Sequence, residues 1–420
     1  MIGAGPSGLA ALKVLRQQGF TGAIGLEQSD RVGGNWVFSP VPGHSSVFET
    51  THIISSKSLS EYSDFPMPAH YPDYPSHRQM AEYFENYAAH FDLHAQIRFG
   101  VRIERAEPIE SGWRLTLSGG TIEDYDAVLV ASGHHWDPRM PSYPGRYTGQ
   151  LLHSREFKSA APFRGSRVLV IGGGNSACDI AVETSRVALA CRISTRRGYY
   201  IVPKFMFGVP ADLLNAGMQW LPALLRHRLS RWTWRLVTGG MARYGLPEPT
   251  HGITEAHPTV NSELLYFIRH GKIHPRPDIT GFDGLRVHFA DGRSEEFDTI
   301  IAATGFKISF PFLDRSVVDF SEGLVPLYLR VFPPRLAGLY FIGLVQPQGC
   351  IWPLAEAQAR VVAGVLAGEL RLPADLDEAA RRDAARISDR FTPSARHTVE
   401  VDYHDHLREL HRALTQLATA

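Results

Sequence analysis

The residues of this chain whose types and spacing could do chemistry begin with a run of glycines. Gly172 and Gly174 directly follow an apolar stretch, Val168–Ile171, and the small Ala177 opens a stretch, 177–186, that is compatible with a helix. Strand, glycine turn and helix in this order are the fingerprint of a dinucleotide site. The glycines allow a tight turn and the approach of a pyrophosphate, and the helix N-terminus favours an anion.

Two arginines stand where such a site would meet the ribose. A second apolar stretch, 188–194, ends at Thr195, and Arg196 lies 19 residues past Ala177, followed by Arg197. In this fold a residue about 20 positions on reaches the ribose 2′ position. Guanidinium groups bind phosphate through a rigid fork of donors, so the pair indicates NADPH. The alternative is a solvated arginine pair on a surface loop.

A second fingerprint lies at the N-terminus. Gly3, Gly5 and Gly8 precede a helix-compatible stretch, 9–18, and a short strand, 23–26, ends at Glu27, 19 residues past Gly8. A carboxylate at this offset accepts hydrogen bonds from ribose hydroxyls and repels a 2′-phosphate. This acidic site therefore suits the adenosine half of FAD, whereas the basic one suits NADPH.

The strand before the first fingerprint is short. Only Met1 and Ile2 precede Gly3, whereas a strand usually has about 5–6 residues. We therefore expect the first strand of the FAD domain to be nearly missing, which would weaken the support beneath the phosphate turn.

Composition excludes several classes of protein. The 420 residues contain 43 Lys and Arg and 43 Asp and Glu, so the net charge of +0 argues against nucleic-acid binding. The 3 cysteines form no Cys-x-x-Cys pair, which excludes a disulfide framework or an evident zinc or redox site. No stretch approaches the ~20 apolar residues of a membrane span. With no signal peptide in evidence, we expect a cytoplasmic protein without a membrane anchor or a bound metal.

The remaining periodicities predict an α/β fold. They indicate a helix at 80–91 with one apolar, mainly aromatic face, a helix at 355–370, a polar helical region at 375–420, and strands at 97–103, 113–117, 127–130, 298–303 and 339–344. The strand at 298–303 ends in Ala303-Thr-Gly305, which matches Ala131-Ser-Gly133, so we expect the chain to return to the first domain there. We predict two Rossmann-like dinucleotide-binding domains, the NADPH domain inserted into a discontinuous FAD domain: 1–158 and 297–420 for FAD, and 159–296 for NADPH.

At this point the chain resembles the flavin-containing monooxygenases over nearly its whole length. The family signature Phe-x-Gly-x-x-x-His-x-x-x-Tyr/Phe is matched by Tyr147, Gly149, His153 and Phe157, with Tyr in place of the first Phe. His153 could act as a base, but we favour a hydrogen-bonding residue that fixes the junction. Further blocks occur in family order: Gly33-Gly-Asn-Trp36, Tyr62-Ser-Asp-Phe-Pro66, Pro258-Thr-Val-Asn261, Ala303-Thr-Gly305, Val331-Phe-Pro-Pro334 and Gln358-Ala-Arg360.

The resemblance implies an enzyme in which NADPH reduces FAD and oxygen adds to the reduced flavin. The resulting flavin hydroperoxide oxygenates a soft nucleophile, nitrogen or sulfur, of a small molecule. The cofactor carries the chemistry, so we nominate no catalytic side chain. Residue by residue, the match assigns FAD contacts to Gly3, Gly5, Gly8, Glu27, Gly34, Asn35, Trp36, Ser55 and Gln358, and NADPH contacts to Gly172, Gly174, Asn175, Ser176, Ala177, Arg196 and Arg197.

One departure from the family bears on that chemistry. Ile54 stands where many members carry an asparagine beside the flavin and nicotinamide, and isoleucine cannot donate a hydrogen bond. We expect either a short-lived hydroperoxide or another residue in the role.

Other functions stay open. A Baeyer–Villiger monooxygenase usually has Trp-Pro or Trp-Asp in the linker, where this chain has Phe157-Lys158. An NADPH oxidase that releases peroxide is favoured by Ile54, and a non-catalytic truncated paralogue by the short first strand. A pyridine-nucleotide disulfide reductase is disfavoured because the dithiol is lacking. The apolar segment 199–244 is either a substrate route or a helical packing insert. A homodimer is compatible with the sequence, which has no motif that fixes the oligomeric state.

Overall fold

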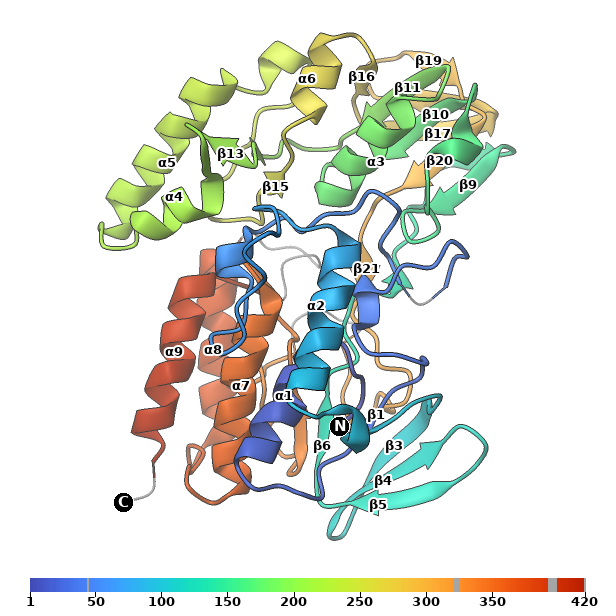
Figure 1. Cartoon of the computed structure of the whole chain (residues 1–420). Helices are drawn as coiled ribbons and strands as arrows, with labels where there is room; N and C mark the ends of the chain where they lie inside the picture. Colours follow the sequence, from blue (N-terminus) through green and yellow to red (C-terminus); the bar gives the residue numbers. More distant parts are fainter. Residues whose placement is uncertain (44, 321–324, 392–398, 419–420) are drawn as a thin grey trace. The chain divides into compact units, whose positions relative to one another are not determined.

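The computed structural model describes residues 1–43, 45–320, 325–391 and 399–418. The chain forms two compact units, each assembled from separate segments (Figure 1). The first unit comprises Met1–Val37, Lys57–His135 and Lys307–Ala420, and the second comprises Phe38–Ser56 and Trp136–Phe306. The predicted α/β architecture, with one Rossmann-like unit inserted into the sequence of another, is confirmed.

The second unit is built on a parallel sheet of five strands in the order β16-β11-β10-β20-β9. Its central strand, β10 (Arg167–Ile171), is buried on both faces, as expected for an apolar run in a parallel sheet. Helix α3 (Asn175–Ser185) connects β10 to β11 (Ala190–Ser194) and packs its apolar face on the sheet. The other strands are β9 (Gln150–His153), β16 (Ile273–Arg276) and β20 (Thr299–Ala302).

Shorter elements complete the second unit. A second sheet, in the order β19-β18-β17-β8, is interleaved in sequence with the five-stranded sheet, since β8 precedes β9 and β17 to β19 lie between β16 and β20. Within the segment 199–244, Trp234 is buried, whereas Trp220 and Trp232 are exposed. The bounds are β7 (Asp137–Pro138), β8 (Gly145–Tyr147), η4 (Ala161–Phe163), β12 (Ile201–Val202), β13 (Phe205–Met206), β14 (Val209–Pro210), α4 (Ala211–Gly217), α5 (Ala223–Thr238), η5 (Ala242–Tyr244), β15 (Thr259–Val260), α6 (Leu264–Arg269), β17 (Ile279–Gly284), β18 (Arg286–Phe289), β19 (Ser294–Glu296) and β21 (Phe306–Lys307).

The first unit contains a narrow parallel sheet. Strand β1 (Gly25–Leu26) pairs with β2 (Ile97–Arg98), and β6 (Val128–Val130) pairs with β22 (Leu339–Phe341). Ile2 lies between the two pairs, because it bridges Leu26 on one side and Val130 on the other. A single buried residue therefore occupies the position that a central strand takes in this type of sheet.

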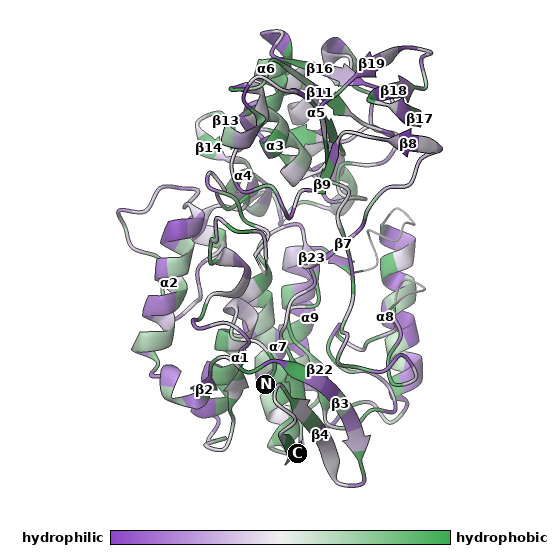
Figure 2. Ribbon diagram, turned by 90° about the vertical axis from the view of Figure 1, so that its right-hand side faces the viewer, coloured by the Kyte–Doolittle hydropathy of each residue, from purple (hydrophilic) through white to green (hydrophobic). Residues whose placement is uncertain are grey.

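Helices pack on that sheet. Helix α1 (Pro6–Gln17) has proline in its first turn, where the missing N–H is harmless, and its apolar face is fully buried. Helix α2 (His77–His90) starts with a capping box between Ser76 and Gln79, and hydrophilic and hydrophobic residues alternate around it (Figure 2). Its predicted apolar face is confirmed as core, since Met80, Tyr83, Phe84 and Tyr87 are buried. The other elements are η1 (Gly34–Trp36), η2 (Lys57–Leu59), η3 (His94–Gln96), β3 (Ile103–Ile109), β4 (Gly112–Leu117), β5 (Ile122–Tyr125), β23 (Gln346–Pro347), α7 (Ile351–Leu366), α8 (Leu376–Arg390), β24 (Glu400–Val401) and α9 (Tyr403–Gln416).

Two expectations differ from the structure. The strand expected at 97–103 is interrupted by Gly100, whose φ of 70° turns the chain from β2 toward β3. The strand expected to return the chain to the first domain, β20, instead pairs with β10 and β9, and the chain enters the first unit at Lys307. Its apolar run reflects burial inside the second sheet. Residues 392–398 and 419–420 of the expected C-terminal helical region lie outside the described residues.

Candidate cofactor-binding sites

The N-terminal glycine turn in the first unit leads directly into a helix. Gly3 has a φ of 98°, and a Cβ there would lie 2.8 Å from the carbonyl oxygen of Ala131. Gly5 is the N-cap of α1, and no side chain of the described residues caps this helix end. A Cβ on Gly8 would lie 2.1 Å from the carbonyl oxygen of Gly3. The three glycines are therefore required by close backbone packing, and the N–H groups of α1 face an open turn suited to an anion.

A second turn meets the first one. The amide of Gly33 donates to the carbonyl oxygen of Ala4 at 3.1 Å. Gly34 has a φ of 54°, and a Cβ there would lie 2.9 Å from the Cα of Gly5. The two glycine backbones therefore approach so closely that a side chain at position 34 would collide with Gly5. Asn35 follows in η1, and Trp36 packs edge-on against Trp352 with ring centroids 5.8 Å apart.

Glu27 lies at the end of β1 and is almost fully buried. One carboxylate oxygen accepts a hydrogen bond from the amide of Ala4 at 2.7 Å, and the other accepts from the amide and hydroxyl of Ser29 at 2.8 and 2.7 Å. A carboxylate has about four acceptor positions, so three serve the protein and about one remains for a hydroxyl. Glu27 thus tightens the glycine turn as well as offering an acceptor beside it.

Gln358 supports the same region from inside the protein. It is completely buried in α7, and its Oε1 accepts a hydrogen bond from the amide of Gly343 at 2.9 Å. A Cβ on Gly343 would lie 2.3 Å from the hydroxyl oxygen of Ser7 in the first turn of α1. Gln358 therefore fixes a loop that packs against the start of α1.

The sequence analysis missed two polar side chains at the end of β6. Among the described residues, neither the hydroxyl of Ser132 nor Nε2 of His134 has a hydrogen-bond partner, although both atoms are buried. Burial lowers the pKa of His134 to about 3, so its ring is neutral. Gly3 packs against the backbone of Ala131 and Ser132, so Ser132 lies next to the glycine turn. The adjacent pair His134-His135 directly after Gly133 was the available signal.

In the second unit, the glycine turn follows β10. A Cβ on Gly172, where φ is 137°, would lie 2.4 Å from the carbonyl oxygen of Ala303 and 3.2 Å from the Cβ of Ala177. Gly174 is the N-cap of α3, which no side chain of the described residues caps. The short side chain of Ala177 is buried against Gly172, as the fingerprint requires, and Ser176 is exposed in the first helical turn.

The arginine pair lies at the same edge of this sheet. Ile171 pairs with Ser194, so the residues after both strands, Gly172 and Thr195, emerge side by side. Among the described residues, no carboxylate lies within 4.0 Å of exposed Arg196. The guanidinium of half-buried Arg197 lies 5.6 Å from the centroid of the Tyr199 ring. The arginine pair therefore follows the strand that lies next to the second glycine turn.

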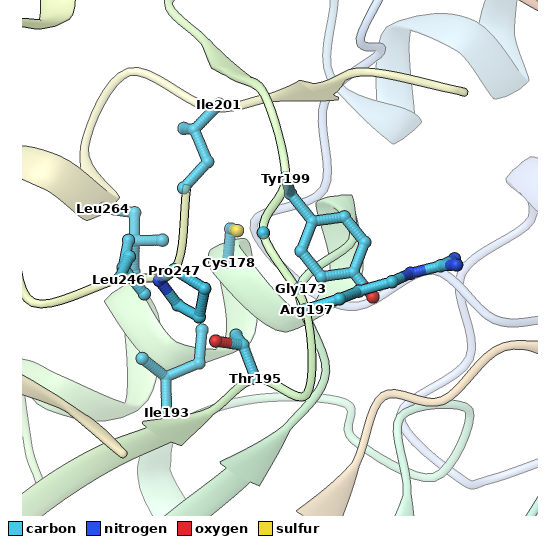
Figure 3. A pocket seen from close by; sticks show the side chains of 11 residues that line it. Gly173, Cys178, Ile193, Thr195, Arg197, Tyr199, Ile201, Leu246, Pro247 and Leu264 are labelled. Atoms are coloured by element: carbon cyan, nitrogen blue, oxygen red, sulfur yellow. The ribbon is translucent and has the colours of Figure 1, made fainter. Parts of the chain in front are cut away.

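A pocket beside the glycine turn brings these residues together. It is lined by Gly173, Cys178, Ile193, Thr195, Arg197, Gly198, Tyr199, Ile201, Leu246, Pro247 and Leu264 (Figure 3). A Cβ on Gly173 would lie 2.2 Å from the Tyr199 ring, so the ring rests on the turn. The buried hydroxyl of Thr195 has no partner among the described residues. Tyr199 and Thr195 were not among the predicted site residues; a polar and an aromatic residue flanking the arginine pair were the signal.

Hydrogen bonds from residues 259–261 hold the glycine turn and the start of α3 in place. Oδ1 of Asn175 accepts a hydrogen bond from the amide of Val260 at 2.7 Å, and the hydroxyl of Thr259 donates to the carbonyl oxygen of Gly173 at 2.7 Å. Asn261 donates to Oδ1 of Asp179 in α3 at 2.6 Å, and burial raises the pKa of that carboxyl group to about 6. The family motif expected at residues 258–261 therefore stabilises the glycine turn and helix α3 through hydrogen bonds.

His153 is a fixing residue, as favoured from the sequence. It is buried, and the amide of Arg155 donates to its Nδ1 at 3.2 Å, so Nε2 carries the proton and donates to the carbonyl oxygen of Gly305 at 3.0 Å. Burial lowers its pKa, which keeps the ring neutral. Ile54 and Ser55 lie in the 38–56 segment of the second unit.

Both glycine turns have the features that a dinucleotide site needs. In each turn the backbone packs so closely that a Cβ would collide with it, and no side chain of the described residues caps the helix that follows. In the described part of the chain, no group of three His, Cys, Asp or Glu side chains is placed to hold a metal ion. No helix within the described ranges has the length and apolar character that a membrane crossing requires.

Comparison with known proteins gives the family. The model of the flavin-binding monooxygenase-like family matches residues 1–417. The chain is 35% identical over 445 residues to flavin-containing monooxygenase 5 of Homo sapiens, covering 98% of this chain and 81% of that protein. It is 36% identical over 436 residues to dimethylaniline monooxygenase [N-oxide-forming] 2 of Cavia porcellus, with the same coverage of 98% and 81%.

A solved structure shares the fold. The S-allyl-L-cysteine S-oxygenase of Allium sativum superposes with a TM-score of 0.74 at 24% identity, covering 100% of this chain and 88% of that one. The chain therefore belongs to the flavin-binding monooxygenase-like family, and it is an NADPH-dependent flavoprotein monooxygenase whose cofactors are FAD and NADPH.

Proposed function

We propose that this enzyme transfers one oxygen atom of O₂ to a soft nucleophilic nitrogen or sulfur of a small molecule. In the balanced reaction, NADPH, a proton, O₂ and the substrate give NADP⁺, water and the oxygenated substrate. When bound, FAD accepts the electrons of NADPH and activates O₂. The name of the relative from Cavia porcellus, which forms N-oxides, supports nitrogen as one acceptor.

The observation that carries the proposal is the opposite charge after two otherwise similar glycine turns. Glu27 follows the turn of the first unit, whereas Arg196 and Arg197 follow that of the second. A buried carboxylate with about one remaining acceptor position suits the unphosphorylated ribose of FAD. Guanidinium groups beside a pocket suit a 2′-phosphate. The first unit would thus bind FAD and the second NADPH.

The residue roles follow from this division. In the first unit, the FAD pyrophosphate would lie over the N-terminus of α1, beside the close contact of Gly5 and Gly34. In the second, that of NADPH would lie over the N-terminus of α3. We propose FAD contacts for Gly3, Gly5, Gly8, Glu27, Gly34, Asn35 and Trp36, support of that site for Gln358, and NADPH contacts for Gly172, Gly174, Asn175, Ser176, Ala177, Arg196 and Arg197.

The chain's own residues have binding and positioning tasks. His153 is neutral and hydrogen-bonded on both ring nitrogens, so it fixes the backbone near Gly305 and moves no proton. Transfer of oxygen to an amine or sulfide requires a dry, oriented site rather than a strong side-chain base.

The first test is the visible absorption spectrum of the purified chain, followed by turnover with tertiary amines and thioethers under isotopically labelled O₂. We expect a bound-flavin spectrum, one labelled oxygen in the N-oxide or sulfoxide, and one NADPH consumed for each product. Peroxide equal to the NADPH consumed, with no product, would identify an oxidase. Esters formed from ketones, without amine or sulfide products, would identify Baeyer–Villiger chemistry. A folded protein that remains colourless with added FAD would contradict an enzymatic role.

A further inference from the structure

The segment Ile53–Ser56 is held at both of its ends by polar side chains of one insertion. Nζ of Lys204 donates a hydrogen bond to the carbonyl oxygen of Ile53 at 3.2 Å. Oδ2 of Asp212 accepts one from the amide of Ser56 at 2.6 Å. Lys204 follows β12 and Asp212 lies in the first turn of α4, and all of these residues belong to the second unit.

The residues that Lys204 and Asp212 anchor are buried, whereas the two anchoring side chains are partly buried. Ile53 and Ser56 are almost fully buried, so an unpaired backbone carbonyl or amide there would be costly. Burial lowers the pKa of Lys204, and the nearby carboxylates of Asp179 and Glu263 oppose that shift. The ammonium group therefore has a carbonyl acceptor on one side and acidic groups on the other.

The strand that precedes Lys204 connects this part of the chain to the glycine turn. Strand β12, just before Lys204, pairs with β15, which contains Thr259 and Val260. Those two residues hydrogen-bond to Gly173 and Asn175 of the glycine turn. The Ile53–Ser56 segment is therefore linked to the glycine turn, within one compact unit, by hydrogen bonds through Lys204, β12 and β15.

Ile54, which lies between the anchors, is a position at which the sequence is expected to depart from the family's asparagine. Ile54 cannot donate a hydrogen bond from its side chain, so the donors of this stretch are the backbone amides and the hydroxyls of Ser55 and Ser56. The Ser56 hydroxyl is buried and has no hydrogen-bond partner among the described residues. The positions of these donors depend on the backbone between Ile53 and Ser56. We propose that Lys204 and Asp212 are positioning residues that hold this backbone in register with the NADPH-binding turn and thereby limit the loss of reducing equivalents as peroxide.

This inference rests on the proposed binding of NADPH at the second glycine turn. Without substrate, the lost equivalents follow the balance in which NADPH, a proton and O₂ give NADP⁺ and H₂O₂. If the anchors are removed, the segment shifts while the glycine turn and arginine pair remain. A displacement of about 1 Å away from the reacting atoms can change a rate by as much as about a hundredfold.

The test compares Lys204→Met and Asp212→Ala with Lys204→Arg and with Arg228→Met, which removes an exposed charge from the same insertion. Hydrogen exchange of the peptide spanning 50–58 is measured with NADP⁺ bound, and peroxide release is measured with NADPH and no substrate. We expect exchange and peroxide release to rise by about tenfold in the first two variants. KM for NADPH should change by less than about twofold, since the phosphate contacts remain. Lys204→Arg should stay near wild type, as should Arg228→Met.

Unchanged exchange and peroxide release in both variants would overturn the proposal. So would a rise in KM for NADPH in proportion to the peroxide effect, because Lys204 would then bind the cofactor directly. If Lys204→Met does not fold, Asp212→Asn retains a neutral acceptor for Ser56 and should show a smaller increase in exchange and peroxide release. Neither readout needs an oxygenated product, so a wild-type enzyme that oxygenates no amine or sulfide refutes the proposed function without deciding this inference.

Discussion

Replacing Arg197 by alanine should discriminate between the two nicotinamide cofactors. Its half-buried guanidinium lines the pocket beside Gly173, near the Tyr199 ring. A hydrogen bond to a charged partner is worth about 1.5–3 kcal/mol when the site is shielded from water. The loss of that interaction with the 2′-phosphate corresponds to an increase of about 10- to 150-fold in KM for NADPH.

The Arg196→Ala variant gives a comparison for the change in KM for NADPH that Arg197→Ala produces. The Arg196 side chain is exposed, so water and salt screen its attraction to the phosphate. We expect Arg196→Ala to raise KM for NADPH by at most about fivefold. KM for NADH, which lacks the 2′-phosphate, should change by less than about twofold in both variants.

Steady-state kinetics with both cofactors at several salt concentrations is the appropriate assay. The effect of Arg197→Ala should shrink as ionic strength rises, because wild-type affinity weakens. Arg164→Ala is the matched control, since this exposed arginine precedes β10 at the opposite edge of the sheet. Equal changes for NADPH and NADH in Arg197→Ala would show that the side chain supports the fold of the pocket rather than binding the phosphate.

Three further predictions concern the first unit. Gly34→Ala should lower FAD affinity by at least about tenfold, seen as lost flavin absorbance, because its Cβ would meet Gly5; Gly22→Ala, with open space around it, should not. Lys13→Met should cost about 3 kcal/mol in urea unfolding, because it leaves buried Glu356 short of a partner, and adding Glu356→Leu should recover most of it. His134→Gln should remove about 2 kcal/mol of acid destabilisation between pH 7 and 5, measured by thermal unfolding. The folded pKa of about 3 lies below the unfolded value, so the folded state loses stability as the pH falls.

Elements adjoining the glycine turns were the most accurately predicted from sequence. The strand and helix around Gly172 were expected at 168–171 and 177–186 and are found at Arg167–Ile171 and Asn175–Ser185. Here an apolar run, a turn that only glycine fits and a helical pattern all indicate the same structure. The assignment of β20 went wrong because an apolar run predicts burial but does not identify the sheet that buries it.

Helix α7 illustrates a local difficulty. The sequence predicted its start at residue 355, after Pro353, but the helix begins at Ile351. Proline within the first helical turn loses no intrahelical hydrogen bond, so it does not mark the end of the preceding loop. At the other end, Gly368 adopts a φ of 74°, and the helix ends at Leu366 rather than at 370.

The candidate site shows what a motif match transfers and what it does not. The match assigns Glu27 and Gln358 to the flavin site alike, but their surroundings differ. Glu27 uses about three of its four acceptor positions on the protein and keeps one beside the turn. Gln358 is completely buried and hydrogen-bonds to Gly343. A sequence motif shows that a residue type is required at a position. The hydrogen bonds of that residue in the structure show whether it has a group left for a ligand or uses its groups to hold the backbone in place. On that criterion, Glu27→Gln should weaken both FAD binding and the glycine turn. Gln358→Leu should weaken FAD binding through the displaced Gly343 loop and through the loss of Nε2, a buried donor that has no hydrogen-bond partner among the described residues.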